Sequence, residues 1–301
     1  MLSAVSSDRH FRSTIFIVLF AASLTVGSRI VPARQKASED IEDLNKACSR
    51  GTYSACFSLG TMHASVQRAC DGGDAQGCSR LGFMYETGAG VQRNLEHAIA
   101  LYRKACDAGG SLGCTRLGVL YDAGMGLPQD LGRAASLYQR ACDEGDQVGC
   151  GELGRMYSNG FGVTKDENHG LALYVKACEK GAPRACTFLG LAYGLGQGAK
   201  RDDSRAAGFY KRGCDGGNAE GCTILGTAYS LGRGVTKDKK MAFSLFQRAC
   251  EDRQPEGCNS LAKSYELGEG VAPDEAKASE LYRKACGMGA ASACGKERGP
   301  Q

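Results

Sequence analysis

Two short apolar stretches alternate along the chain, and each has the spacing of an amphipathic helix. Residues 214–249 show the pattern well, because the apolar or small residues of their first stretch fall at i, i+3, i+4 and i+7. These positions are Cys222, Leu225, Gly226 and Tyr229. The spacing predicts a first helix from Asn218 to about Leu231. Gly232 and Gly234 predict its end, since glycine readily adopts the left-handed conformation of a helix C-cap.

The second stretch of the same unit predicts a second helix. Asp238 suits its N-cap, because a short carboxylate can accept hydrogen bonds from the first free backbone N–H groups. The apolar residues again follow the 3/4 spacing, at Ala242, Leu245, Phe246, Ala249 and Cys250. No segment shows period-2 alternation long enough for a strand, so we predict an all-α fold.

This helix pair recurs every 36 residues from residue 70 onward. The first helix carries a leucine column, Leu81, Leu117, Leu153, Leu189, Leu225 and Leu261, and a tyrosine column, Tyr85, Tyr121, Tyr157, Tyr193, Tyr229 and Tyr265. A glycine column lies beside them at Gly82, Gly118, Gly154, Gly190 and Gly226, and is broken only by Ala262. Glycine inside a helix costs about 1 kcal/mol against alanine, so the column predicts a neighbouring helix too close for a Cβ. One helix pair cannot bury its apolar face alone, and we therefore predict an α/α solenoid of stacked pairs.

Sixteen cysteines mark the same period. They form eight pairs separated by eight residues: Cys48/Cys56, Cys70/Cys78, Cys106/Cys114, Cys142/Cys150, Cys178/Cys186, Cys214/Cys222, Cys250/Cys258 and Cys286/Cys294. Zinc sites usually draw on Cys-x2–4-Cys spacings, and catalytic thiols would not occur in eight copies. We therefore predict that each cysteine forms a disulfide with its partner eight residues away. Each short bridge should stabilise the fold by roughly 2–3 kcal/mol in the chain-entropy model.

These columns set the predicted boundaries. Six full repeats cover residues 70–105, 106–141, 142–177, 178–213, 214–249 and 250–285, and a partial repeat at 286–295 stops inside its first helix. A truncated N-terminal repeat at 40–69 lacks about 14 residues, roughly the loop and much of the second helix, by comparison with the full units. We expect residues 29–39 to form a disordered linker and residues 296–301 a loose tail.

Residues 1–28 have the features of a signal peptide. Basic residues precede an apolar run at residues 15–26, which has signal-peptide length and is short for a membrane span. Val26 and Ser28 suit the −3 and −1 positions of a signal-peptidase site, which predicts cleavage after Ser28 and no stable membrane span afterwards. We predict a secreted or periplasmic protein. An uncleaved anchor and import into the mitochondrial intermembrane space are the alternatives.

Composition and charge argue against nucleic-acid binding and exclude little else. The formal net charge of +4 over 301 residues is too mild for a nucleic-acid binder, and no basic stripe supports one. The 43 glycines recur at fixed offsets, and we interpret them as turn residues rather than as a sign of disorder.

The unit A-C-x7-C-x2-LG-x2-Y-x2-G, followed by a helix ending in LY-x-[KR]-A-C, resembles the Sel1-like repeat. With its paired cysteines, the chain is similar to the Helicobacter cysteine-rich protein family over about residues 40–295. The resemblance implies a right-handed superhelix in which each disulfide joins the second helix of one repeat to the first helix of the next. It also implies export, and for some members penicillin binding with weak β-lactamase activity, whereas a eukaryotic relative assists cytochrome oxidase assembly in the mitochondrial intermembrane space. The chain departs from the pattern in its short first unit, at Gly213, where alanine is preferred, and at Pro255.

Few residues point to catalysis, and we assign none. Ser260 and Lys263 fit the S-x-x-K pattern of serine β-lactamases, but the supporting S-D-N and K-T-G elements are absent, so we interpret Ser260 as a surface serine. His63, His97 and His169 have no histidine partner at i+4 and no H-E-x-x-H context. The sequence therefore predicts no metal site and no cofactor.

The better lead is the face of the first helix opposite its leucine and tyrosine columns. Positions two, five, six and nine after the second cysteine lie there, and a solenoid usually exposes such a face on its concave side. The residues that we assign to partner binding are Arg80, Arg116, Arg155, Phe188, Leu191, Leu195, Ile224 and Leu231, and the same positions include Met84, Leu120 and Met156. This face predicts a non-enzymatic scaffold for a protein or peptide ligand, unless neighbouring helices cover it. The family resemblance adds a peptidoglycan-like or β-lactam small molecule as an alternative ligand.

Overall fold

The computed structural model describes residues 41, 43–50 and 53–296, without the side chains of residues 53, 54, 56 and 57, and every regular element in this part is helical. The first-row helices are α3 (Ala75–Thr87), α5 (Ser111–Ala123), α7 (Gln147–Asn159), α9 (Pro183–Leu195), α11 (Ala219–Leu231) and α13 (Pro255–Leu267). The second-row helices are α4 (Leu95–Asp107), α6 (Leu131–Asp143), α8 (Glu167–Glu179), α10 (Asp203–Asp215), α12 (Lys239–Glu251) and α14 (Glu275–Gly287). A longer helix, α2 (Tyr53–Asp71), precedes them, and a 3-10 turn, η1 (Ala291–Ala293), follows.

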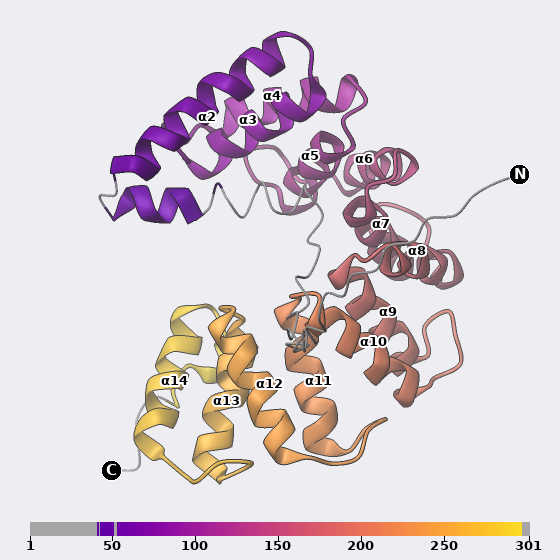
Figure 1. Cartoon of the computed structure of the whole chain (residues 1–301). Helices are drawn as coiled ribbons and strands as arrows, with labels where there is room; N and C mark the ends of the chain where they lie inside the picture. The colour runs from indigo at the N-terminus through magenta and orange to yellow at the C-terminus, as the bar shows by residue number, and fades with distance from the viewer. Residues whose placement is uncertain (1–40, 42, 51–52, 297–301) are drawn as a thin grey trace, which may run out of the picture.

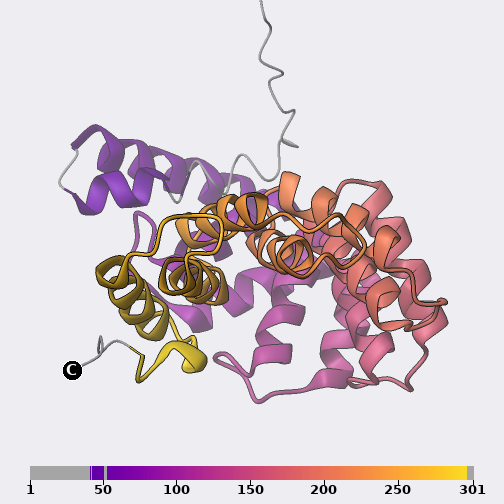
Figure 2. The same ribbon diagram turned by 90° about the horizontal axis from the view of Figure 1, so that it is seen from below.

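The helix pairs stack into an arc that opens towards the left of Figure 1, with α2 and α14 at its two ends. First-row helices of successive repeats contact one another, whereas each second-row helix packs mainly on the first-row helices that flank it. The first row therefore lines the inner side of the arc. Seen from below, the golden C-terminal helices are nearly end-on while the indigo α2 lies across the view, so the helix axes turn along the solenoid (Figure 2).

Polar caps and glycines define where the helices begin and end. Each second-row helix of the six repeats has an Asp or Asn N-cap whose side chain accepts a backbone N–H of the first turn. Asp238 has this role in α12, as predicted, and accepts from Lys240 and Met241. Gly232 ends α11 in the left-handed conformation, with a φ of 73°.

The glycine column faces the aromatic ring of the neighbouring second-row helix and, in several repeats, the backbone of that helix as well. A Cβ added at Gly190 would lie 2.6 Å from the ring of Tyr210, and one at Gly226 would lie 2.6 Å from the ring of Phe246. The first-row helix thus leaves a slot for the large aromatic residue of its own second-row helix. The prediction that a neighbouring helix approaches too closely for a Cβ is confirmed, because at Gly190 the Ala206 carbonyl oxygen would also lie only 3.0 Å from a Cβ.

A second glycine joins each repeat to the one before it. Gly234 has a φ of 70°, and a Cβ there would lie 1.9 Å from the carbonyl oxygen of Asp203 at the start of α10. The turn after α11 therefore rests directly on the preceding repeat, a contact that only glycine permits.

Seven disulfides connect the rows, all with the predicted separation of eight residues. They are Cys70–Cys78, Cys106–Cys114, Cys142–Cys150, Cys178–Cys186, Cys214–Cys222, Cys250–Cys258 and Cys286–Cys294. Cys178–Cys186, for example, joins the end of α8 to the start of α9 with a Cα–Cα distance of 4.6 Å. Each bridge thus spans the turn between one repeat and the next, as the family resemblance implies. The eighth predicted bridge, Cys48–Cys56, includes a cysteine side chain outside the described residues.

The bridges also belong to the hydrophobic core, as the predicted apolar face of the first helix indicates. Cys78, Cys114 and Cys258 lie in the first turns of α3, α5 and α13, and each is at most 1% exposed. Cys114 packs with Ala141 of the following second-row helix, and Cys258 packs in one cluster with Leu261. Their sulfurs face the interior because the second cysteine of each pair shares the apolar face of its helix with the leucine column. These three cysteines are therefore buried packing residues as well as links, and they offer no surface to a ligand.

The ends of the solenoid differ from the full repeats. In the truncated unit, α2 is a single helix of 19 residues that packs on α3, so the loop of a full repeat is replaced by continuous helix. The partial unit at the other end consists of η1 and the Cys286–Cys294 bridge. The predicted signal segment, the linker at residues 29–39 and residues 297–301 of the predicted tail lie outside the described residues. Within the described part, no helix combines the length and apolar character that crossing a bilayer requires.

The two single-residue departures from the repeat pattern, at Pro255 and Gly213, have structural reasons. Pro255 occupies the first turn of α13, where a missing N–H removes no helical hydrogen bond. At Gly213, a Cβ would lie 2.2 Å from the hydroxyl oxygen of Thr187, which hydrogen-bonds Asn218 at 2.8 Å. Glycine at this position therefore makes room for a polar contact between neighbouring first-row helices.

Candidate binding surface

The face predicted to be open is only partly open. Position six after the second cysteine belongs to the core, because Met84, Leu120 and Met156 are at most 1% exposed. Their assignment to the open face was wrong. Each first-row helix contacts two second-row helices and the adjacent first-row helices, so its buried face is wider than a single helix pair would require.

The inner surface of α5, α7 and the start of α9 is closed by charges. Glu152 is buried and accepts from Arg155 at 2.9 Å and from Arg184 at 2.8 Å, and Arg155 also pairs with Asp122. Burial alone would lower the pKa of Arg155, but its contacts with Glu152 and Asp122 outweigh burial and raise that pKa. These four residues, here called the charged junction, link three repeats. Arg155, one of the predicted binding residues, is therefore already engaged in ion pairs within the chain.

Two other predicted binding residues lie against aromatic rings. The Arg116 guanidinium lies 4.9 Å from the centroid of the Phe83 ring, and Arg184 lies 5.1 Å from that of Phe188. Phe188 also packs on Tyr174 and is only 9% exposed, so it offers little surface to a partner. Arg80 is exposed on α3, far along the chain from the residues described next.

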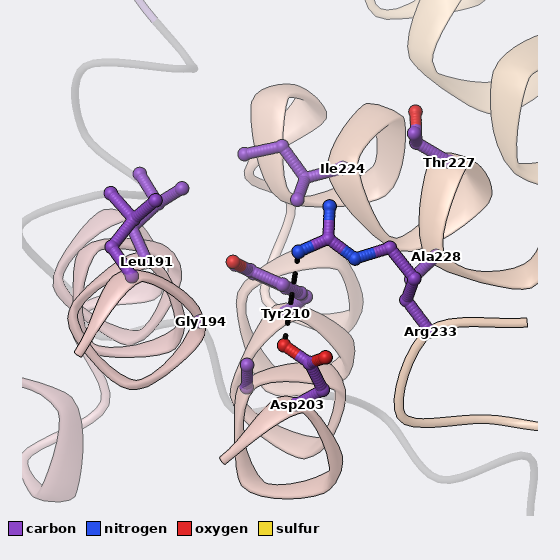
Figure 3. Close-up of a pocket in the computed structure, with 10 residues that line it drawn as sticks. Leu191, Gly194, Asp203, Tyr210, Ile224, Thr227, Ala228 and Arg233 are labelled. Atoms are coloured by element: carbon purple, nitrogen blue, oxygen red, sulfur yellow. Dashed lines mark ion pairs between the residues drawn. The ribbon is translucent and has the colours of Figure 1, made fainter. Parts of the chain in front are cut away.

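Three predicted residues do come together. Leu191 and Leu195 of α9 and Ile224 of α11 line a cavity of about 170 Å³ between α9, α10 and α11 (Figure 3). Thr227 and Ala228 of α11 also line the cavity. On the α9 side the lining includes Gly194, which has no side chain. We call this the open junction.

The polar end of the open junction comes from residues that the sequence did not indicate. Asp203 and Arg233 line it and form a long ion pair of 3.8 Å, while Arg201 holds Asp203 at 2.9 Å. The hydrogen bond from Arg201 lowers the pKa of Asp203. Tyr210 of α10 also lines the cavity, and burial raises its pKa to about 12, so its hydroxyl remains protonated at neutral pH.

Gly194 is the reason that this junction is open. The same position carries a larger side chain in the other repeats: Glu86, Asp122, Ser158, Ser230 and Glu266. Glu86 accepts a hydrogen bond of 2.5 Å from Tyr102, and Ser158 hydrogen-bonds Tyr174. Within the described residues nothing hydrogen-bonds the Tyr210 hydroxyl. A break in an otherwise polar column was the signal in the sequence that could have located this cavity.

Exposed leucines continue from the cavity along the first row. Leu195, Leu231 and Leu267 occupy position nine of consecutive repeats and are 64%, 59% and 54% exposed. The same position in the earlier repeats holds Thr87, Ala123 and Asn159. At this position of the first row, large apolar side chains thus occur only in the last three full repeats, and we call these three residues the exposed leucines.

The other chemical candidates lie elsewhere. Ser260 and Lys263 are on α13, where the Ser260 carbonyl accepts a hydrogen bond from the Ser264 hydroxyl at 3.1 Å, and neither lines the open junction. His97 packs against Tyr85, and His169 against Tyr157, each with ring centroids 4.3 Å apart. Among the described side chains, no three His, Cys, Asp or Glu gather closely enough to bind a metal ion.

Comparison with known structures supports the repeat architecture. A Sel1 repeat protein from Oxalobacter formigenes is 27% identical, with coverage of 82% of this chain and 99% of that chain and a TM-score of 0.67. The c5321 antigen of uropathogenic Escherichia coli is 28% identical with a TM-score of 0.60; the alignment covers 77% of this chain and 50% of that protein, so the chain spans about half of its length. Helicobacter pylori cysteine rich protein B is 27% identical, with coverage of 52% and 97% and a TM-score of 0.33. No curated protein sequence matches significantly.

The family model for the Sel1 repeat matches six consecutive segments. They are residues 75–110, 111–146, 148–181, 183–218, 219–252 and 255–289. Each segment contains one first-row helix and the second-row helix that follows it. The period, the helix pairing and the model matches agree, and the chain belongs to the Sel1 repeat family.

Proposed function

We propose that this chain is an exported scaffold that binds a segment of a partner protein along the inner, first-row surface of its C-terminal half. The exposed leucines carry the proposal, because three large apolar side chains stand in solvent at the same position of consecutive repeats. Such an apolar strip on a concave surface suits the capture of a protein segment. Disulfide-linked Sel1 repeats are typical of modules that mediate protein interactions.

The proposal that the protein is exported is based on the seven disulfides. Disulfides persist in oxidising compartments, so the protein functions outside the cytoplasm. A secreted or periplasmic location is our proposal, with the mitochondrial intermembrane space as the alternative. A mature N-terminus at Arg29, measured by mass spectrometry of the protein from its source, supports the proposal, and a chain that keeps residues 1–28 contradicts it.

The binding proposal is tested by site-specific photo-crosslinking in the native compartment. A photoreactive residue at position 231, one of the exposed leucines, should give a discrete adduct with a partner protein. Position 241 is the matched control, because Met241 is also exposed and apolar but lies on the second-row helix α12. We expect no comparable adduct there.

A double variant, Leu195→Asp with Leu231→Asp, should abolish the adduct formed from position 267 while the far-ultraviolet circular dichroism stays helical. Asp is tolerated at these positions because both leucines are exposed. Phe188 is less suitable for this test, since a charge there would disturb its packing on Tyr174. An adduct that persists in the double variant contradicts a role of the exposed leucines.

A further inference from the structure

We propose that the open junction holds the C-terminal residue of a partner protein, with a branched aliphatic side chain in the cavity and the terminal carboxylate beside Tyr210 and Arg233. This inference rests on the proposed function, because the exposed leucines would hold the residues that precede the terminus. It adds a definite chemical group to the otherwise apolar surface.

The size and walls of the cavity set the aliphatic part. About 170 Å³ is well below the roughly 300–1,000 Å³ of pockets that take drug-sized ligands, so one side chain is the right scale. Leu191, Leu195 and Ile224 supply branched aliphatic walls from two helices, and Ala206 of α10 also lines the cavity. A leucine, isoleucine or valine side chain would bury its surface against groups of its own kind.

The charge at the cavity edge sets the anionic part. Arg201 and Arg233 share one carboxylate, Asp203, which leaves a net charge of +1 in this cluster. Arg201 makes the shorter contact, at 2.9 Å against 3.8 Å for Arg233, and the Arg233 side chain is about half exposed. Arg233 is therefore the guanidinium that an incoming carboxylate can engage.

The Tyr210 hydroxyl supplies a neutral donor beside that guanidinium. Its raised pKa keeps it protonated, and no group in the described chain hydrogen-bonds to it. In Figure 3 the hydroxyl points towards the side of the cavity formed by Leu191 and Gly194, with Arg233 and Asp203 on either side of the ring. A terminal carboxylate can accept hydrogen bonds from both the Tyr210 hydroxyl and the Arg233 guanidinium. An internal peptide carbonyl carries no charge and would bind these two donors less strongly.

This combination occurs at one junction of the described repeats. The position of Arg233 is taken by Ala89, Met125, Phe161, Gln197 and Glu269 elsewhere, and that of Gly194 always carries a larger side chain. The following repeat also has Phe246 in place of a tyrosine. Two departures from the repeat pattern thus meet in one cavity, and both make it more receptive to a carboxylate.

The test uses the full, oxidised chain and a fluorescein-labelled peptide Ser-Gly-Ser-Gly-Ala-Leu, followed by fluorescence anisotropy. The free acid should bind about tenfold more tightly than the same peptide with a C-terminal amide, since hydrogen bonds to a charged group contribute more than neutral ones. A peptide ending in glycine should bind more weakly than either leucine peptide. Equal affinity of acid and amide, or no binding of the acid at millimolar concentration, overturns the proposal.

Variants assign the parts of the site. Arg233→Gln should reduce the preference for the acid over the amide to less than about threefold, and Tyr210→Phe should weaken the acid by about three- to tenfold. Gly194→Ser should strongly weaken binding of the acid, because its Cβ would lie 3.0 Å from the Tyr210 hydroxyl and its own hydroxyl would hydrogen-bond that group, as Ser158 does with Tyr174. Gly208→Ser is the control, since a Cβ there meets nothing within 4 Å, and it should bind as the unaltered chain does.

The variants are chosen to preserve the fold. The chain itself carries serine at the Gly194 position in Ser158 and Ser230, and phenylalanine at the Tyr210 position in Phe246. Unchanged circular dichroism and an unchanged disulfide map confirm folding for each variant. Binding of the acid by Gly194→Ser at full strength would place the peptide elsewhere and overturn the assignment.

Two further measurements separate this inference from others. Free leucine and 4-methylpentanoate share the aliphatic and carboxylate groups, and either one binding as tightly as the peptide would make the cavity a small-acid site and overturn the peptide assignment. If the unaltered chain ignores the peptide while position 231 still forms its adduct, the cavity inference alone fails. If position 231 forms no adduct, the scaffold proposal fails.

Discussion

The charged junction and the open junction are built from equivalent helix pairs and equivalent disulfides, but they present opposite surfaces. At equivalent positions, Glu152 corresponds to Phe188, Arg155 to Leu191 and Ser158 to Gly194. In the first case ion pairs fill the space between successive first-row helices, and in the second an apolar cavity remains. The scaffold is therefore separable from the surface, because a few side chains of each first-row helix decide which surface a repeat presents.

If the two junctions differ only in their surfaces, their disulfides should contribute equally to the free energy of unfolding. Replacing both cysteines of Cys142–Cys150 or of Cys214–Cys222 by serine should cost about 2–3 kcal/mol in either case, because both bridges close loops of the same length. Urea unfolding of the two double variants, followed by circular dichroism, measures this. A difference between them above about 1 kcal/mol would show that the scaffold itself differs at the two places.

The charged junction should depend on its buried carboxylate. Glu152→Gln removes the charge that faces Arg155 and Arg184, and we expect a loss of about 1–3 kcal/mol, since a buried ionic contact loses its compensation. Asp203→Asn at the open junction should destabilise the chain much less, because the Arg201 and Arg233 side chains are more than half exposed and solvent screens the ion pairs. Comparable losses in the two variants would contradict the distinction.

Both junctions should lose stability in alkali through their buried tyrosines. Burial raises the pKa of Tyr138 beside the charged junction and that of Tyr210 in the open junction above the ordinary value of 10.0. The folded chain then holds its phenol protons more tightly than the unfolded chain. The tyrosines therefore contribute their full stabilisation below pH 10, and the contribution of Tyr210 is lost as the pH rises through its pKa of about 12. Urea midpoints measured across this range should fall less steeply in Tyr210→Phe, and an unchanged slope would argue that Tyr210 titrates normally.

The smallest effect concerns the position that opens or closes a junction. Gly194→Ser should stabilise the chain by about 0.5 kcal/mol, because glycine is the poorer helix former. Ser158→Gly should destabilise it by more than this, because it also removes the hydrogen bond to Tyr174. Thermal unfolding of the two reciprocal variants compares them directly. Destabilisation by Gly194→Ser would mean that the Tyr210 ring, which lies close to the added Cβ, cannot adjust.

Local and periodic features of the fold could be predicted from the sequence. The cap at Asp238, the helix end at Gly232 and the cysteine pairs depend on residues that lie close together in the sequence. The structure contains the cap, the helix end and seven of the eight predicted pairs among its described residues. The glycine column was correctly associated with close packing. Repetition made these inferences strong, because each pattern occurs several times.

The surface was harder to predict because it depends on contacts between repeats. The burial of Met84 and Leu120 follows from how successive first-row helices pack, which the periodicity of one helix does not reveal. The ion pair between Asp122 and Arg155 joins residues 33 positions apart. At the open junction the apolar walls were predicted, whereas Gly194 and Arg233 were missed because attention to recurring columns hides the position where a column breaks.

The placement of the bridges also decides how the chain responds to proteases. Each sulfur link encloses the turn between two repeats, so cleavage of a peptide bond inside that turn leaves the two pieces covalently joined. The longer turn within a repeat, such as residues 232–238, is enclosed by none of the seven bridges. The resistance of the intact chain to proteases therefore depends on how well these inner turns, held in place by residues such as Gly234, are kept out of a protease's active site.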